Sequence, residues 1–182
     1  MLPLWRLATV LAAVAGLWLR LPAEPGAGLT ARAGRTCPVT IAPTNWRPTG
    51  PAFGPGRFNY GNTRIRAALY WPRGTLVAGE LPDGGVMAVI QRDGSISLKL
   101  GWWRGVAGTL VITGRRLDRP TGPLRGDVPP NESYGETGFI PSSVVFPSTG
   151  CWRVTGKQGG ASLTFIVKVI KAKLPSISPA PS

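Results

Sequence analysis

Residues 150–170 read GCWRVTGKQGGASLTFIVKVI. Apolar and polar side chains alternate on both sides of the glycine pair at 159–160, and a period of two residues is typical of half-buried β-strands. The alternation predicts one inward row made of Trp152 and Val154 on the first strand and Leu163, Phe165, Val167 and Val169 on the second. The segment therefore predicts a closing β-hairpin, with Cys151 on the outward face.

The composition agrees with an all-β domain. The chain has 182 residues, and its 25 Gly and 19 Pro supply many turns, while 43% hydrophobic residues give enough apolar sequence for a core. Disordered chains are usually less apolar. We expect short strands joined by turns, with no helix after the N-terminal segment.

Further strands are expected upstream of the hairpin. Residues 63–71 alternate strictly, and 86–91 and 95–102 flank Asp93-Gly94, a strong hairpin signal. Shorter strands are expected at 37–41, 75–78, 109–113 and 139–146, the last interrupted by Pro141. Two turn-rich loops, 42–62 and 114–138, separate them. About seven to nine antiparallel strands predict a two-sheet β-sandwich, with a closed barrel as the alternative.

The N-terminal segment is typical of an export signal. Arg6 precedes an apolar run at 7–19, which is short for a membrane span of about 30 Å. Cleavage after Ala33, or earlier after Ala23 or Ala27, and an uncleaved anchor are all compatible with this pattern. The domain organisation expected is a signal peptide or anchor with a signal helix at 1–33, a β-sandwich at 34–173 and a flexible Pro/Ser tail at 174–182.

Cys37 and Cys151 are the two cysteines of the chain. In an oxidising compartment we expect them to pair, which would fasten the first strand to the outside or edge of a sheet. Two free thiols are the alternative. Gly34-Arg35-Thr36 before Cys37 is a poor lipoprotein signal.

The order of several motifs resembles a known group of proteins. The motifs are the strand at 62–71, Asp93-Gly-Ser-Ile96, Leu100-Gly-Trp-Trp-Arg104, Thr113-Gly-Arg-Arg-Leu-Asp118 and residues 146–169. Together they resemble exported bacterial proteins and lipoproteins of unknown function with an immunoglobulin-like sandwich. The resemblance covers residues 37–171. It implies an immunoglobulin-like fold and an extracytoplasmic location, and it implies no catalytic residues.

Charge and residue types limit the chemistry. The formal net charge is +13, from 21 basic and 8 acidic residues, and a charge this basic favours anionic partners. A solvated basic surface without a ligand is the alternative, because the charges are spread along the chain. The chain has no histidine, the commonest general base and metal ligand, so we expect no metal and no cofactor.

Arginines and one tryptophan are the candidate binding residues. Arg115, Arg116, Arg119 and Arg125 fall within one expected loop, and guanidinium groups bind phosphate or carboxylate groups through paired hydrogen bonds. Trp103 is adjacent to the inward-facing Trp102, so it should lie on the outer sheet face. There it could stack on a sugar ring or a partner protein, or be covered by the 42–62 loop.

Two classes of function follow. The sequence favours a non-enzymatic, extracytoplasmic protein that binds an anionic or glycan envelope component, or another envelope protein; nucleic acid is not expected. The alternative is a small extracytoplasmic hydrolase that uses Glu132 and Glu136, near Asp127, as paired carboxylates.

Overall fold

The computed structural model describes residues 36–43, 47–81 and 87–172. The expected signal segment, and the tail from residue 174 onward, lie outside these residues. In the described residues ten strands form two sheets. The larger has β1 (Tyr60–Gly61), β2 (Ile65–Ala67), β4 (Val89–Ile90), β5 (Ile96–Arg104), β7 (Arg125–Asp127) and β8 (Gly138–Phe146). The smaller has β3 (Thr75–Ala78), β6 (Val111–Arg116), β9 (Gly150–Gln158) and β10 (Ala161–Lys171).

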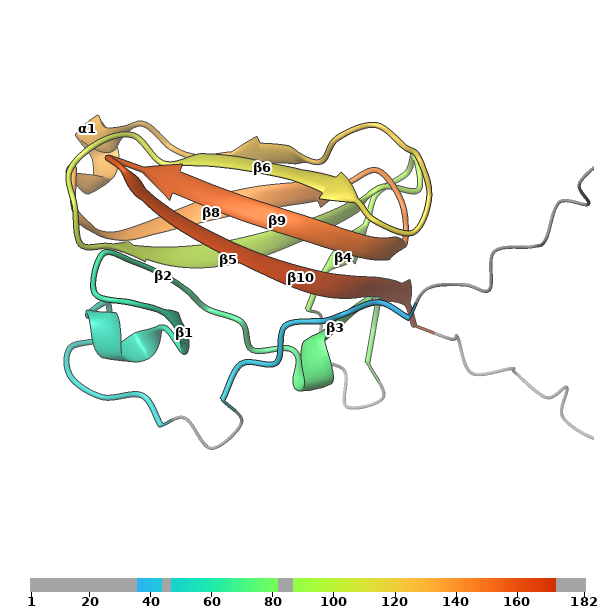
Figure 1. Ribbon diagram of the computed structural model, residues 1–182, viewed down its shortest axis with the longest axis horizontal. Coiled ribbons are helices and arrows are strands. Elements are labelled where there is room, and N and C mark those ends of the chain that lie inside the picture. Colours follow the sequence, from blue (N-terminus) through green and yellow to red (C-terminus); the bar gives the residue numbers. More distant parts are fainter. Residues whose placement is uncertain (1–35, 44–46, 82–86, 173–182) are drawn as a thin grey trace, which may run out of the picture. The chain divides into compact units, whose positions relative to one another are not determined.

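The two sheets lie face to face, with β6, β9 and β10 in front of β5 and β8 in Figure 1. The larger sheet has the order β1-β2-β5-β8-β7, with β4 paired to β5, and the smaller has the order β3-β10-β9-β6. Two 3₁₀ turns, η1 (Pro55–Arg57) and η2 (Pro72–Gly74), and the short helix α1 (Asn131–Tyr134) lie in the connections, so the expectation of no helix after the N-terminal segment is corrected by one four-residue helix. No helix in the described part of the chain is long and apolar enough to cross a membrane. The prediction of an all-β, two-sheet architecture is confirmed.

The core lies between the sheets, and the rows predicted from alternation form it. The six residues of the inward hairpin row are all in the buried cluster, together with Ile65, Ala67, Leu69 and Trp71 and with Ile96, Leu98, Leu100 and Trp102. Aromatic rings connect the two layers: Trp102 lies 6.3 Å from Phe165, and Phe146 lies 5.6 Å from Trp152, between ring centroids.

Both expected hairpins are present. β9 and β10 pair around Gly159 and Gly160, whose φ angles of 46° and 73° a residue with a Cβ rarely adopts. β4 and β5 pair around the Asp93-Gly94 turn. In that turn the Asp93 carboxylate accepts hydrogen bonds from the backbone N–H and the hydroxyl of Ser95, and these bonds lower the pKa of Asp93.

Four strand predictions are corrected. β3 pairs parallel with β10, and its Ala78 forms an isolated parallel bridge to Ala88, whereas the other pairs of named strands in the described residues are antiparallel. β8 runs through Pro141 without a break, since β7 pairs only with residues 143–145 and leaves one edge of β8 unpaired at the proline. The expected strand at 37–41 is an extended segment outside the regular sheets, and β6 continues to Arg116 instead of ending at 113.

Candidate functional site

The outer face of the smaller sheet carries rows of polar and basic side chains. Every second residue of β10, every second residue of β9 from Trp152 to Gln158, and Ile112 of β6 are buried, so the residues between them lie on the outer face. The register joins the outward residues into four rows across the strands: Val111, Lys157 and Ser162; Thr113, Thr155 and Thr164; Arg115, Arg153 and Ile166; and Cys151, Lys168 and Thr75. We call this surface, defined by these residues, the basic face.

The Arg115–Arg153 pair is the most unusual feature of the basic face. The two arginines are direct cross-strand partners, and like charges placed opposite each other in an antiparallel pair are destabilising. Neither side chain makes a hydrogen bond or ion pair with the described residues. An anion bound between them would relieve their repulsion.

Threonine hydroxyls lie beside this pair. The Thr155 and Thr164 hydroxyls are 2.9 Å apart and share a hydrogen bond. Thr113, Gly114 and Thr155 line a hollow of about 290 Å³ together with Arg115 and Arg153. The site therefore offers both cationic and neutral hydrogen-bond donors to an anionic group.

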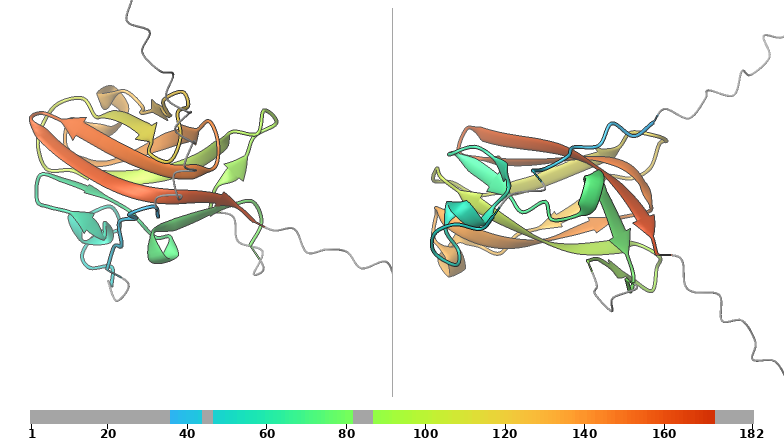
Figure 2. Two further views of the ribbon diagram at one scale, coloured as in Figure 1. Left: turned by 45° about the vertical axis from the view of Figure 1, so that its right-hand side comes forward. Right: turned by 90° about the horizontal axis from the view of Figure 1, so that it is seen from below.

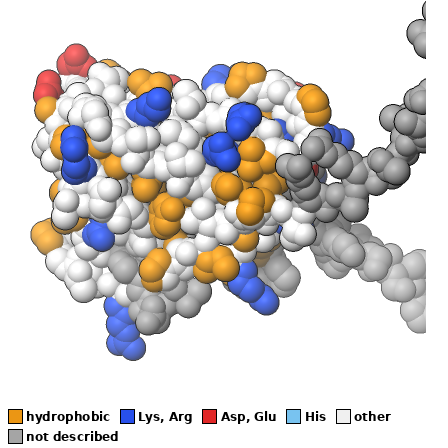
Figure 3. Space-filling model, viewed as in Figure 1, with side chains coloured by type: hydrophobic (Ala, Val, Ile, Leu, Met, Phe, Trp, Pro, Cys, Tyr) orange, Lys and Arg blue, Asp and Glu red, His pale blue; other side chains and the backbone are white. Residues whose placement is uncertain are grey.

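The charge of this face has one sign. The strands β3, β6, β9 and β10 contain no Asp or Glu, whereas Arg115, Arg153, Lys157 and Lys168 project from its outer surface. Figure 3 shows blue side chains scattered over this face, and the largest group of red side chains at the end where α1 lies. A surface of one sign attracts oppositely charged ligands over about one Debye length, 8 Å in physiological salt.

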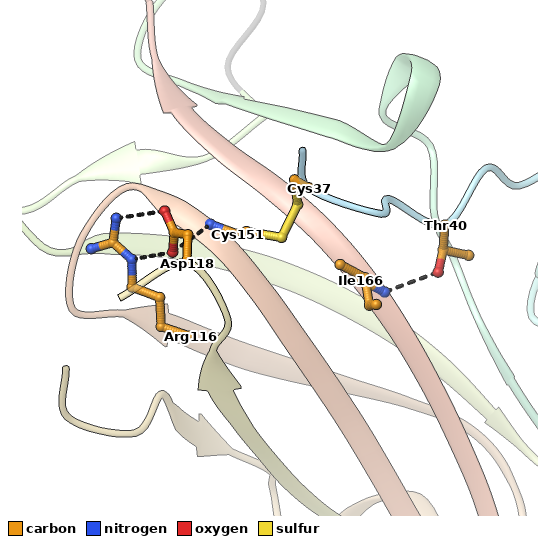
Figure 4. Close-up of a disulfide and its surroundings, with 6 residues drawn as sticks. All are labelled: Cys37, Thr40, Arg116, Asp118, Cys151 and Ile166. Carbon is orange, nitrogen blue, oxygen red and sulfur yellow. Dashed lines mark hydrogen bonds and ion pairs between the residues drawn. A yellow bond between two sulfur atoms is a disulfide. The ribbon is translucent and has the colours of Figure 1, made fainter. Parts of the chain in front are cut away.

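A disulfide fastens the N-terminal segment at one end of the basic face. Cys37 and Cys151 are bonded, as predicted, with their Cα atoms 5.5 Å apart. Cys151 is only 4% exposed, but it lies outside the core cluster and its cross-strand partner Lys168 is exposed, so it is on the outer face, as predicted, and buried there. The backbone N–H of Thr40 donates to Ile166 O at 2.8 Å, and its hydroxyl accepts from Ile166 N at 2.9 Å (Figure 4). Residues 37–40 therefore form a strap held by β9 and β10, and Figure 2 shows this blue segment crossing close to β10.

Arg116 and Asp118 form an ion pair beside this disulfide. The Arg116 Nε and Nη2 atoms donate to the two Asp118 oxygens at 2.6 and 3.0 Å, and Nη1 donates to Ser148 at 2.9 Å. Asp118 also accepts the backbone N–H of Cys151 at 3.3 Å (Figure 4). Gly150 makes room for this arrangement, because a Cβ there would lie 2.3 Å from Arg116 Nε.

These contacts make the Asp118 carboxyl more acidic. The hydrogen bonds from Arg116, followed by that from Cys151, lower its pKa from 3.8 to about 2. Since folding favours the ionised form, the stabilisation is complete above about pH 4 and is lost as the pH falls toward 2.

The structure separates the four predicted binding arginines. Arg115 is on the basic face, Arg116 is occupied by Asp118, and Arg119 is exposed in the following loop. Arg125 lies on β7 in the larger sheet, where it lines a hollow of about 530 Å³ with Arg92 and Asp93. Sequence reasoning missed Arg153, whose signal was its outward position between Trp152 and Val154.

Trp103 lies on the outer face of the larger sheet, as expected, and is half-buried there. Its cross-strand neighbours are Arg66 on β2 and Phe139 on β8. The loop before β1 packs on the same surface, because the ring centroids of Phe53 and Phe58 lie 4.9 and 6.1 Å from that of Phe139. Trp103 is therefore separated from the basic face by the full thickness of the sandwich.

Arg104 carries a buried positive charge. The predicted strand ended at Trp102, so it did not include this residue. Its side chain donates hydrogen bonds of 2.8–3.3 Å to Asn131 Oδ1 and to the carbonyl oxygens of Tyr134, Gly135, Thr137 and Gly138. Burial lowers its pKa. Continued alternation along β5 would have placed Arg104 inward. Its contacts hold the segment 131–138, so its role is structural.

The carboxylates expected for the alternative hydrolase do not line a common cleft in the described residues. Glu132 is on α1 and Glu136 follows it, and both are exposed, as is Asp127 on β7. None of the three lines the hollows of the basic face or that beside Arg125. The described residues hold no group of three or more His, Cys, Asp or Glu side chains placed to bind a metal ion.

No protein-family model matches the chain, and no curated protein matches it either.

Proposed function

We propose that this protein is an extracytoplasmic, non-catalytic binding protein whose basic face takes an anionic polymer of the cell envelope. One observation carries the proposal: Arg115 and Arg153 stand side by side, exposed or half-exposed, on a sheet face that has no carboxylate on its strands. A polymer with regularly spaced phosphate or carboxylate groups would lie across the rows, with arginine donors on its anions and threonine hydroxyls alongside.

The location and the fold family are parts of the same proposal. The Cys37–Cys151 disulfide favours an oxidising compartment, which agrees with an export signal or an anchor at 1–33. A two-sheet sandwich with a β9–β10 hairpin is compatible with an immunoglobulin-like domain. The parallel pairing of β3 with β10 is a departure from a purely antiparallel sandwich.

Binding to heparin and to long-chain polyphosphate tests the proposal, with neutral dextran as the ligand control. Arg115→Gln/Arg153→Gln should weaken the binding of polyanions by about tenfold or more, because each lost charged hydrogen bond is worth more than 1 kcal/mol. The slope of log affinity against log salt should also become shallower.

Arg92→Gln/Arg125→Gln is the matched control, since it also removes two positive charges, but from the side of the larger sheet. We expect this control to keep wild-type affinity within about threefold, because exposed charges at a distance are screened. Equal losses in both variants would mean that net charge alone attracts the polymer. That result, or a wild-type protein that binds neither polyanion, would refute the proposal.

A further inference from the structure

Two hollows flank the disulfide at the end of the basic face. One has a volume of about 670 Å³ and the other about 390 Å³. Thr36, Cys37, Arg116, Asp118 and Cys151 line both of them, so the disulfide and the adjacent ion pair form their common wall. The strap therefore builds a concave site on a surface that would otherwise be an open sheet face.

The larger hollow carries uncompensated positive charge. Lys168 and Lys171 line it, and both are exposed. Neither makes a hydrogen bond or an ion pair with any residue that the structure describes. Among the described lining residues Asp118 is the one carboxylate, and its charge is balanced by Arg116 at 2.6 Å. The described lining side chains thus leave a net charge of +2.

Hydroxyl groups complete the polar lining. Thr36 directly precedes the strap, and Thr149 directly precedes β9. A phosphate group suits such a lining, because lysine binds phosphate as a point charge and hydroxyls donate to its remaining oxygens. The smaller hollow, lined by Arg115 and Arg153, connects the same wall with the basic face.

We propose that the hollow lined by Lys168 and Lys171 is a binding site for a phosphate group, and that the Cys37–Cys151 disulfide is required to form it. The proposal rests on the proposed function, for which this hollow would receive a phosphate at the end of the polymer. The group could equally belong to a free pyrophosphate or to a phospholipid headgroup. Because Thr36 and Cys37 are part of the wall, loss of the disulfide opens the site.

Calorimetric titration of the oxidised protein with sodium pyrophosphate tests the site. Lys168→Gln/Lys171→Gln should weaken pyrophosphate binding by about tenfold or more, since two charged hydrogen bonds are lost. Arg92→Gln/Lys99→Gln removes the same two charges from the larger sheet and should change the affinity by less than about twofold. Equal affinity of the wild type and the lysine variant, or no binding by the wild type, would overturn the site.

The disulfide-free variant Cys37→Ala/Cys151→Ala tests the second half of the proposal. It should lose pyrophosphate binding while it keeps the binding of long polyphosphate through Arg115 and Arg153. Undiminished pyrophosphate binding would overturn the role of the disulfide. Circular dichroism and tryptophan fluorescence check that the variant remains folded.

The two binding assays together separate the two proposals, and one further measurement identifies the ligand. Retained polyanion binding without pyrophosphate binding refutes the phosphate site and leaves the proposed function standing, whereas the reverse result refutes the proposed function alone. Vesicles of phosphatidylcholine with and without phosphatidic acid identify the source of the phosphate. Binding that requires phosphatidic acid and is displaced by pyrophosphate supports the site with a lipid headgroup as its ligand, and pyrophosphate binding without vesicle binding supports it with a soluble phosphate.

Discussion

Removal of the Cys37–Cys151 disulfide should cost this domain much of its stability. The bond joins residues 114 positions apart, so it closes a loop that contains the strands from β1 to β8. In the chain-entropy model, a loop of this length lowers the entropy of the unfolded chain by about 16 cal/mol/K, or about 5 kcal/mol at 25 °C. We therefore expect Cys37→Ala/Cys151→Ala to lower the free energy of unfolding by about 4–5 kcal/mol.

The strap should keep most of its native contacts without the disulfide, so the loss of stability should come mainly from the entropy of the unfolded chain. The backbone and hydroxyl of Thr40 keep their hydrogen bonds to Ile166 when the disulfide is absent, and Val39 still packs against Gly74. The folded state should thus lose little apart from local order at residues 36–38. Most of the change should appear in the unfolded state, which becomes less restricted.

Urea unfolding followed by tryptophan fluorescence measures the loss, because Trp71, Trp102 and Trp152 are buried in the core. In thermal unfolding, the melting temperature should fall by about 10–20 °C, at 2–4 °C per kcal/mol for a domain of this size. Thr40→Val is the matched control for the strap, since it removes one hydroxyl contact, keeps the disulfide and should cost about 1 kcal/mol. A loss below about 2 kcal/mol in the double alanine variant would refute the entropic argument.

Three other substitutions test the packing and the charges. Asp118→Asn should cost about 1 kcal/mol at pH 7, a value reduced for the 36% exposure of the carboxylate, and should flatten the loss of stability between pH 4 and 2 that urea midpoints measure; an unchanged acid profile would contradict the Arg116 pairing. Arg104→Met should lower the free energy of unfolding by about 3–5 kcal/mol and speed amide hydrogen exchange in residues 131–138, since five hydrogen bonds are lost. Exchange rates equal to those of the wild type would show that this loop does not depend on Arg104. Gly156→Ala should lower stability by about 1–3 kcal/mol in thermal unfolding, because its Cβ would lie 2.6 Å from the Trp102 ring; a neutral result would mean that the ring can move aside.

Local alternation predicted the buried rows correctly, since each side chain of a strand follows the same two-residue period wherever the strand is placed. It also predicted the outward position of Cys151, because Trp152 and Val154 occupy the inward positions on either side of Arg153. With two cysteines in the chain, their pairing was available from the sequence as well.

The candidate site was less accessible to sequence reasoning. The four candidate arginines are close in sequence, yet the structure separates them. Arg115 and Arg116 are both on β6, where Arg116 pairs with Asp118, whereas Arg119 is in an exposed loop and Arg125 is on β7. The true neighbour of Arg115 is Arg153, which is 38 residues away and was not among the candidates. Proximity along the chain is a poor guide here, because a strand carries successive side chains to opposite faces and the next strand can belong to the other sheet.

The sequence by itself determined the all-β character of this protein, its inward rows, its closing hairpin and its disulfide, since each depends on local periodicity or on residue counts. The tertiary structure alone decided which strands are neighbours and in which register and direction they pair. Those choices produced the parallel β3–β10 pair, the Arg115–Arg153 pair and the hollow beside Cys151. They depend on how whole sheets bury their apolar faces against each other, and that free energy is not encoded in any single segment.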